Sequence, residues 1–182
     1  MYISSANQTA LSARYRLTAL IVAALGVSTV LYVVIGWAFA PAMPRGDYEW
    51  LAQSHYIIIG LVAVVSVAVV FLRRFFLAPA RLLNAGREGI SALLGQLYLC
   101  ALVGAVLGDV VGILGVVASL VTGNREYSWR LGLAALLLIA YSFPRRGEWE
   151  RAVAGLEAEK SNLQPSARMA AEQIKLGLSE TE

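Results

Sequence analysis

Four long stretches of this chain carry almost no charge, and they limit the folds that it can adopt. Three of them contain no charged residue: Leu17–Pro44, Trp50–Leu72 and Leu131–Pro144. The fourth, Gly89–Asn124, contains only Asp109. A bilayer core of about 30 Å is crossed by about 20 helical residues, and backbone groups in lipid must be hydrogen-bonded within their own segment. The sequence therefore predicts membrane-spanning helices.

The composition excludes an ordinary soluble domain. Hydrophobic residues make up 58% of the 182 residues and charged residues 15%, whereas about a quarter of a soluble domain is charged. We expect an all-α integral membrane protein, a bundle of four transmembrane helices over Leu17–Ala40, Ser54–Leu72, Ser91–Val121 and Tyr127–Phe143. The third span has 31 residues, about 46 Å at roughly 1.5 Å each, so it must tilt or project beyond the lipid. Pro41 disfavours signal-peptide cleavage after the first span.

Basic residues set the expected orientation. The N-terminal tail (1–16), the loop after the second span and the helical C-terminal tail (144–182) hold 12 of the 15 Lys and Arg residues. The other side has Arg45, Arg125 and Arg130. Because Lys and Arg are enriched in cytoplasmic loops, we expect both termini in the cytoplasm, with a bacterial inner membrane as the location.

Arginines near the ends of the spans predict contacts with lipid. Their long side chains reach toward the headgroups, and each is worth about 1 kcal/mol near an anionic surface. We expect the bilayer and its anionic headgroups to be partners of Arg73, Arg74, Arg81, Arg145 and Arg146.

Small residues repeat along one face of the third span. Gly104, Gly108 and Gly112 recur every four residues, and Gly115 falls on the same side. Such repeats let helix backbones approach closely. Two alternatives follow: the face packs against another span of the same chain, or it packs against a second copy or another subunit of a membrane complex.

Asp109 lies near the middle of the third span, on the shoulder of the glycine repeat. Inserting a central aspartate costs about 2.5–3.5 kcal/mol, which makes it a candidate functional residue. Ser28, Thr29 and Ser66 lie at similar depth in the first two spans, and we expect them to form a polar cluster with it. The carboxyl either takes up and releases a proton or cation, or stays neutral and hydrogen-bonds between helices.

The stretch Leu99–Gly115, with its acidic residue followed by a small apolar and glycine run, resembles the carboxylate helix of rotary ATPase proteolipid subunits. The preceding loop with Arg73, Arg74 and Pro79 is similar to the polar loop of that family. The resemblance implies a proton site at Asp109.

The chain also resembles a loose group of uncharacterised bacterial four-span membrane proteins. The shared features are the acidic helix, a Pro-Arg-Arg after the last span (Pro144–Arg146) and the run Trp149–Arg151. Two departures from the proteolipid pattern limit the carry-over to the proton site. The second span has only one glycine, Gly60, and an aspartate replaces the more frequent glutamate at position 109.

The C-terminal tail has helical polarity from residue 148 onward, with Trp149, Val153 and Leu156 at helical spacing. Pro165 interrupts this pattern, and a second short amphipathic stretch follows. Three alternatives stay open for the tail: it lies on the membrane, contacts a partner protein or is loosely ordered.

The sequence contains no recognisable catalytic or cofactor motif. One histidine, His55, and one cysteine, Cys100, cannot build a His/Cys metal site or an internal disulfide, and no P-loop, GxGxxG or CxxC pattern occurs. We therefore expect no enzyme activity, cofactor, metal or nucleic acid partner. The favoured function is a structural or accessory subunit of a membrane assembly. The alternative is a proton- or cation-translocating, proteolipid-like oligomer.

Overall fold

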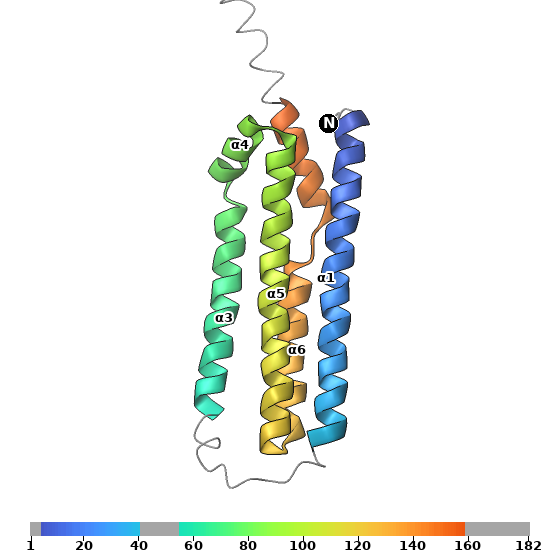
Figure 1. Ribbon diagram of the computed structural model, residues 1–182. Helices are drawn as coiled ribbons and strands as arrows, with labels where there is room; N and C mark the ends of the chain where they lie inside the picture. Colours follow the sequence, from blue (N-terminus) through green and yellow to red (C-terminus); the bar gives the residue numbers. More distant parts are fainter. Residues whose placement is uncertain (1–4, 41–54, 159–182) are drawn as a thin grey trace, which may run out of the picture.

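The computed structural model describes residues 5–40 and 55–158, and its regular elements are helices throughout. The labelled helices follow the chain in Figure 1 as α1 (Ser5–Phe39), α3 (His55–Phe76), α4 (Pro79–Glu88), α5 (Ile90–Thr122) and α6 (Arg125–Ser142). Residues 146–158 are also helical and are called segment 146–158 below. The predicted all-α class is confirmed. Arg45, Ser54 and the second amphipathic stretch of the tail lie outside the described residues.

Three helices form the centre of the bundle. α1, α5 and α6 pack against one another, and α3 lies mainly against α5. In Figure 1, α1 and α5 run in one direction, and α3 and α6 run in the other. The start of α1, the end of α3, α4 and segment 146–158 therefore share one end of the bundle, called the α4 end below (Figure 1).

Three of the described helices are long and apolar enough to cross a membrane. Their apolar stretches are Asn7–Phe39 in α1, Tyr56–Phe76 in α3 and Ile90–Thr122 in α5. These helices support a multi-pass membrane protein. α6 covers the fourth predicted span, but it is not among the three, since Arg125, Glu126 and Arg130 lie in its first two turns.

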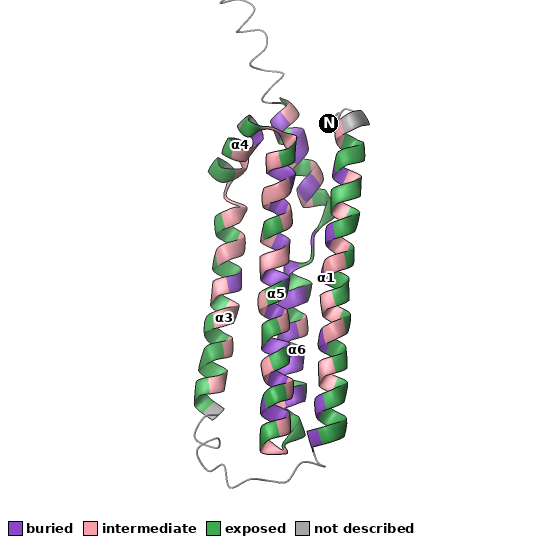
Figure 2. Cartoon of the chain, in the orientation of Figure 1, coloured by how far each residue is buried: buried purple, intermediate pink, exposed green. Residues whose placement is uncertain are grey.

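The outer surface of the bundle is apolar, as a surface that faces lipid requires. Large side chains such as Leu20 on α1 and Ile57 on α3 are 68% and 71% exposed, and exposed residues run the length of both helices in Figure 2. In the most apolar 18-residue stretch of α5, 44% of the residues are buried, whereas in the same kind of stretch of α3 only 6% are buried. α5 is therefore the central helix, and α3 is peripheral.

A short turn joins α5 to α6. Gly123 adopts a left-handed conformation with φ 65°, which glycine tolerates without strain. The Asn124 side chain then accepts a hydrogen bond of 2.9 Å from the Glu126 backbone N–H and caps α6. A connection this short makes the two helices antiparallel neighbours.

The α4 end contains its own core of large buried side chains. The buried residues that form it come from α1, α5 and segment 146–158: Leu11, Leu93, Leu94, Leu97, Trp149, Val153 and Leu156. The ring of Trp149 also meets that of Tyr15 edge-on, with centroids 5.9 Å apart. α5 is thus longer than a span because its first turns belong to this core.

Residues from both predicted tails contribute to this core, which the sequence did not predict. The predicted N-terminal tail (1–16) is helical from Ser5, and α1 continues without a break into the first span. Segment 146–158 packs on the protein's own α1 and α5, a contact that the sequence did not predict. Asn7 Nδ2 also donates a hydrogen bond of 2.6 Å to Glu157 Oε1. The loop after α3 forms the ten-residue helix α4, with Pro79 at its first turn.

Replacing Trp149 with alanine should destabilise the protein strongly. Trp149 is 3% exposed, and truncating a buried tryptophan costs about 3–5 kcal/mol. Thermal unfolding in mild detergent measures the loss. Trp129→Ala is the matched control, since Trp129 is 58% exposed and its loss should change stability by no more than about 0.5 kcal/mol. Equal losses for the two variants would contradict the described core.

Candidate functional site

Asp109 lies at mid-height of the three central helices. The residue before it, Gly108, faces Ala135 and Ile139 of α6, and Gly112 one turn later faces Thr29 of α1. Ala135 and Thr29 lie near the middle of the fourth and first predicted spans. Asp109 therefore lies level with the middle of the first and fourth predicted spans.

The Asp109 carboxyl contacts a hydroxyl from another helix. Thr29 Oγ1 lies 3.2 Å from Asp109 Oδ1 and 3.0 Å from the backbone oxygen of Leu25. Thr29 is fully buried, whereas Asp109 is half-buried. Thr29 Oγ1 thus lies within donating distance of two acceptors, the Asp109 carboxyl of α5 and the Leu25 carbonyl of its own helix.

Of the three hydroxyls expected near Asp109, the structure brings one to it. Ser66 Oγ donates a hydrogen bond of 2.8 Å to the Val62 carbonyl of its own helix, α3. Ser28 is half-buried, and within the described ranges the hydrogen bond to the Asp109 carboxyl comes from Thr29. The polar cluster is therefore a pair that joins α1 to α5.

The glycine face of α5 packs against the same chain. A Cβ added at Gly115 would lie 2.9 Å from the Leu131 Cβ of α6, and one at Gly112 would lie 3.0 Å from Thr29 Cγ2. Gly104 lies against the buried Ser142 at the end of α6. All four glycines are thus covered from within the chain, which supports the first of the two alternatives for this face.

Further small and hydroxyl residues hold α1 to α6. Ser128 is buried, and its Oγ lies 3.1 Å from the Val33 carbonyl oxygen of α1. Gly36 lies against the same Ser128, and Gly132 lies against Val33. Close approach of backbones is therefore the common device of all three central helices.

Gly108→Ala should destabilise the bundle by about 1–3 kcal/mol, the usual cost of overpacking. The added Cβ would lie 2.8 Å from Ile139 Cγ1 and 3.2 Å from the Ala135 backbone oxygen, so α5 and α6 must separate. Gly60→Ala is the control, because a Cβ at Gly60 meets nothing within 4 Å. Thermal unfolding in detergent gives the comparison. A changed oligomer mass with unchanged stability for Gly108→Ala would point to packing between copies instead.

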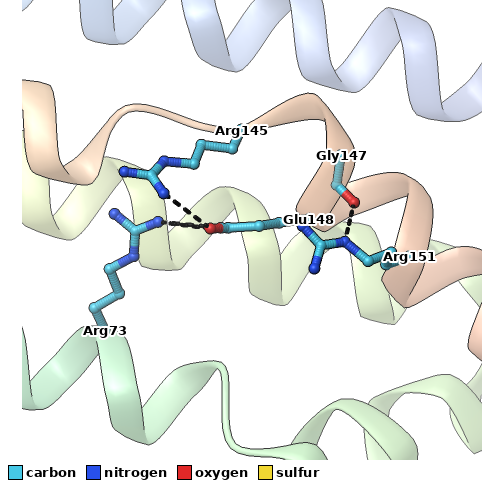
Figure 3. A network of polar contacts seen from close by, with 5 residues as sticks. All are labelled: Arg73, Arg145, Gly147, Glu148 and Arg151. Atoms are coloured by element: carbon cyan, nitrogen blue, oxygen red, sulfur yellow. Dashed lines mark hydrogen bonds and ion pairs between the residues drawn. The ribbon is translucent and has the colours of Figure 1, made fainter.

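A second group of charged side chains lies at the α4 end (Figure 3). Arg73 Nη2 of α3 lies 3.0 Å from Glu148 Oε2 and 3.3 Å from Oε1. The Arg73 guanidinium also lies 4.7 Å from the centroid of the Tyr141 ring, and Arg145 Nη1 approaches Glu148 Oε1 at 3.9 Å. This group connects the peripheral α3 with the chain that follows α6.

The Arg73 side chain is 13% exposed, which differs from the expected contact with lipid headgroups. Its Nη1 is the buried side-chain polar atom of the described residues without a hydrogen-bond partner. Among the other four predicted headgroup ligands, Arg81 stacks on Phe75 at 3.5 Å, and Arg146 pairs with Glu150 at 2.7 Å. These four arginines are exposed, so their contact with lipid stays a prediction.

Glu148 and Tyr141 belong to this group, and the sequence did not single them out as site residues. Both lie close to the predicted inner end of the last span, as Arg73 lies close to the inner end of the second. The sequence therefore predicts that these three residues lie at a similar depth. It does not predict that Arg73 contacts Glu148 and Tyr141, because that contact depends on which helices are neighbours.

The described residues hold no group of three or more His, Cys, Asp or Glu residues that could bind a metal ion. Comparisons with protein-family models, with curated proteins and with solved structures found no match to this chain. Asp109 with Thr29 and Arg73 with Glu148 both join helices through polar side chains.

Glu148→Gln should lower the free energy of unfolding by about 1–3 kcal/mol. The change leaves the largely buried Arg73 without its counter-charge, and a hydrogen bond to a charged group is worth about that much. Glu150→Gln is the matched control: its pair with Arg146 is 42% and 63% exposed, and exposed pairs contribute about 0–1 kcal/mol. Chemical unfolding in detergent separates the two. A larger loss for Glu150→Gln would contradict the structural role of Glu148.

Proposed function

We propose that this chain is a non-enzymatic structural or accessory subunit of a membrane assembly. It crosses a bacterial inner membrane four times, with both termini in the cytoplasm. The antiparallel fit of α6 beside α5 supports α6 as the fourth span. The positive-inside rule supports the orientation, since Arg73 in the last turn of α3 and Arg81 in α4 lie at the α4 end.

The observation that carries this proposal is the half-buried state of Asp109. Its Oδ1 contacts Thr29, and within the described residues its Oδ2 has no hydrogen-bond partner. Three neighbours on α5 border it with exposed apolar side chains: Val106, Val110 and Ile113 are 44%, 43% and 40% exposed. A carboxyl at the edge of a lipid-facing surface is costly, and a membrane-embedded partner that covers this edge removes the cost.

The packing of the glycine face limits the surfaces to which such a partner can bind. Because α6 and Thr29 cover Gly104, Gly108 and Gly112, association with another subunit uses a different surface. The remaining surface is the edge between α1 and α5, where the Asp109 carboxyl is half-buried. A second copy of the chain or a different subunit fits this requirement.

The second candidate function is proton or cation translocation by a proteolipid-like oligomer. It is favoured by one contact: a mid-height carboxyl that shares a hydrogen bond with Thr29 across two helices. The resemblance of Leu99–Gly115 to the proteolipid carboxylate helix supports the same reading.

Asp109→Asn and Asp109→Leu distinguish the two functions. We expect Asp109→Leu to lose the assembly that wild-type protein retains in mild detergent, measured by native mass. Proton flux is measured in vesicles that contain each variant. Ser66→Ala is the control, because Ser66 donates its hydrogen bond to Val62 within α3, and the variant should change neither property.

Loss of flux in Asp109→Asn with unchanged assembly would establish translocation and displace the accessory role. Wild-type assembly and wild-type flux in both Asp109 variants would refute both functions. Infrared difference spectroscopy on the same samples reports whether the carboxyl titrates between about pH 5 and pH 9. A carrier must titrate, whereas a permanently neutral structural group does not.

A further inference from the structure

An open groove lies at the α4 end, between α4, the first turns of α5 and the end of α3. It encloses about 900 Å³, counting the part open to solvent. The residues that define it are Phe76, Arg81, Asn84, Gly95, Gln96 and Leu99. α3 ends at Phe76, so the groove lies where a candidate span leaves the membrane.

Small residues keep the groove open. A Cβ added at Gly95 would meet nothing within 4 Å, and Ala85 and Ala92 line the same space. Gln96 Nε2 donates a hydrogen bond of 2.9 Å to the Phe76 carbonyl oxygen, which holds the end of α3 beside α5. The groove is therefore built between connected elements and is not a gap between loose ones.

The two ends of the groove differ in polarity. At α4, the Arg81 guanidinium stacks on the Phe75 ring at 3.5 Å, which uses its face and leaves N–H groups at its edge to donate. Asn84 lies one turn further along α4 and is exposed. At the other end, Leu99 is 51% exposed, one turn of α5 beyond Gly95. An amphiphile with an anionic head matches this gradient.

We propose that this groove binds one glycerophospholipid. Its phosphodiester accepts hydrogen bonds from Arg81 and Asn84, and one acyl chain runs along Gly95 toward Leu99. Glu88 also lines the groove, so a second negative charge on the headgroup is repelled. The occupant is thus a singly charged phosphodiester lipid. The site depends on the chain lying in a membrane and not on the function of Asp109.

Native mass spectrometry of the purified full chain, with phosphatidylglycerol added in mild detergent, tests the proposal. We expect Arg81→Gln to weaken binding of the first lipid about tenfold, as loss of a charge-assisted hydrogen bond does. Gly95→Leu should abolish that binding because it fills the groove. Arg151→Gln and Gly60→Leu are the matched controls: Arg151 is an exposed arginine of segment 146–158 at the same end, and Gly60 is equally uncrowded. Both should retain wild-type binding.

Equal binding by Arg81→Gln and Arg151→Gln would overturn the proposal, as would equal binding by Gly95→Leu and Gly60→Leu. Thermal unfolding in lipid-free detergent shows whether each variant is folded. If Gly95→Leu unfolds early, Ala92→Leu fills the same groove and replaces it. Tighter binding of the doubly charged phosphatidic acid would also contradict the assigned lipid class.

Discussion

The close approach of α5 and α6 is the contact on which the rest of the bundle depends. In lipid, the hydrophobic effect does not drive two apolar helices together, so close packing of their surfaces must stabilise the contact. Gly108 and Gly115 bring the α5 backbone to within contact of Ala135 and Leu131. α1 then lies against both helices, with Thr29 facing Gly112. The position of Asp109 follows from this arrangement.

The apolar part of the bundle and the α4 end are stabilised by different interactions. In the apolar part of the bundle, small residues and buried hydroxyls such as Ser128 let the helices approach closely around buried residues such as Val111 and Leu138. At the α4 end, Trp149 and Leu94 form a core of large side chains, for which water supplies the driving force. Arg73 and Glu148 lie between these regions and connect α3 to both.

The packing of the helices leaves two places uncovered. α6 and α1 cover the glycine face of α5 but leave Asp109 half-buried beside exposed valines. α4 lies across the end of α5 but leaves the space above Gly95 empty. The first place suits a membrane-embedded protein partner, and the second suits a phospholipid. Both are surfaces where a polar group borders apolar side chains.

The sequence by itself determined the helices, the apolar surface and the mid-height carboxyl, because periodicity, length and absence of charge are local properties of the chain. It also placed Thr29 at the depth of Asp109. Only the tertiary structure decided that α6 covers Gly108, that Arg73 turns toward Glu148 and that segment 146–158 packs on α1. The physical reason is that these contacts join residues far apart in the chain. Which of several suitable surfaces meet is set by the packing of all the helices together.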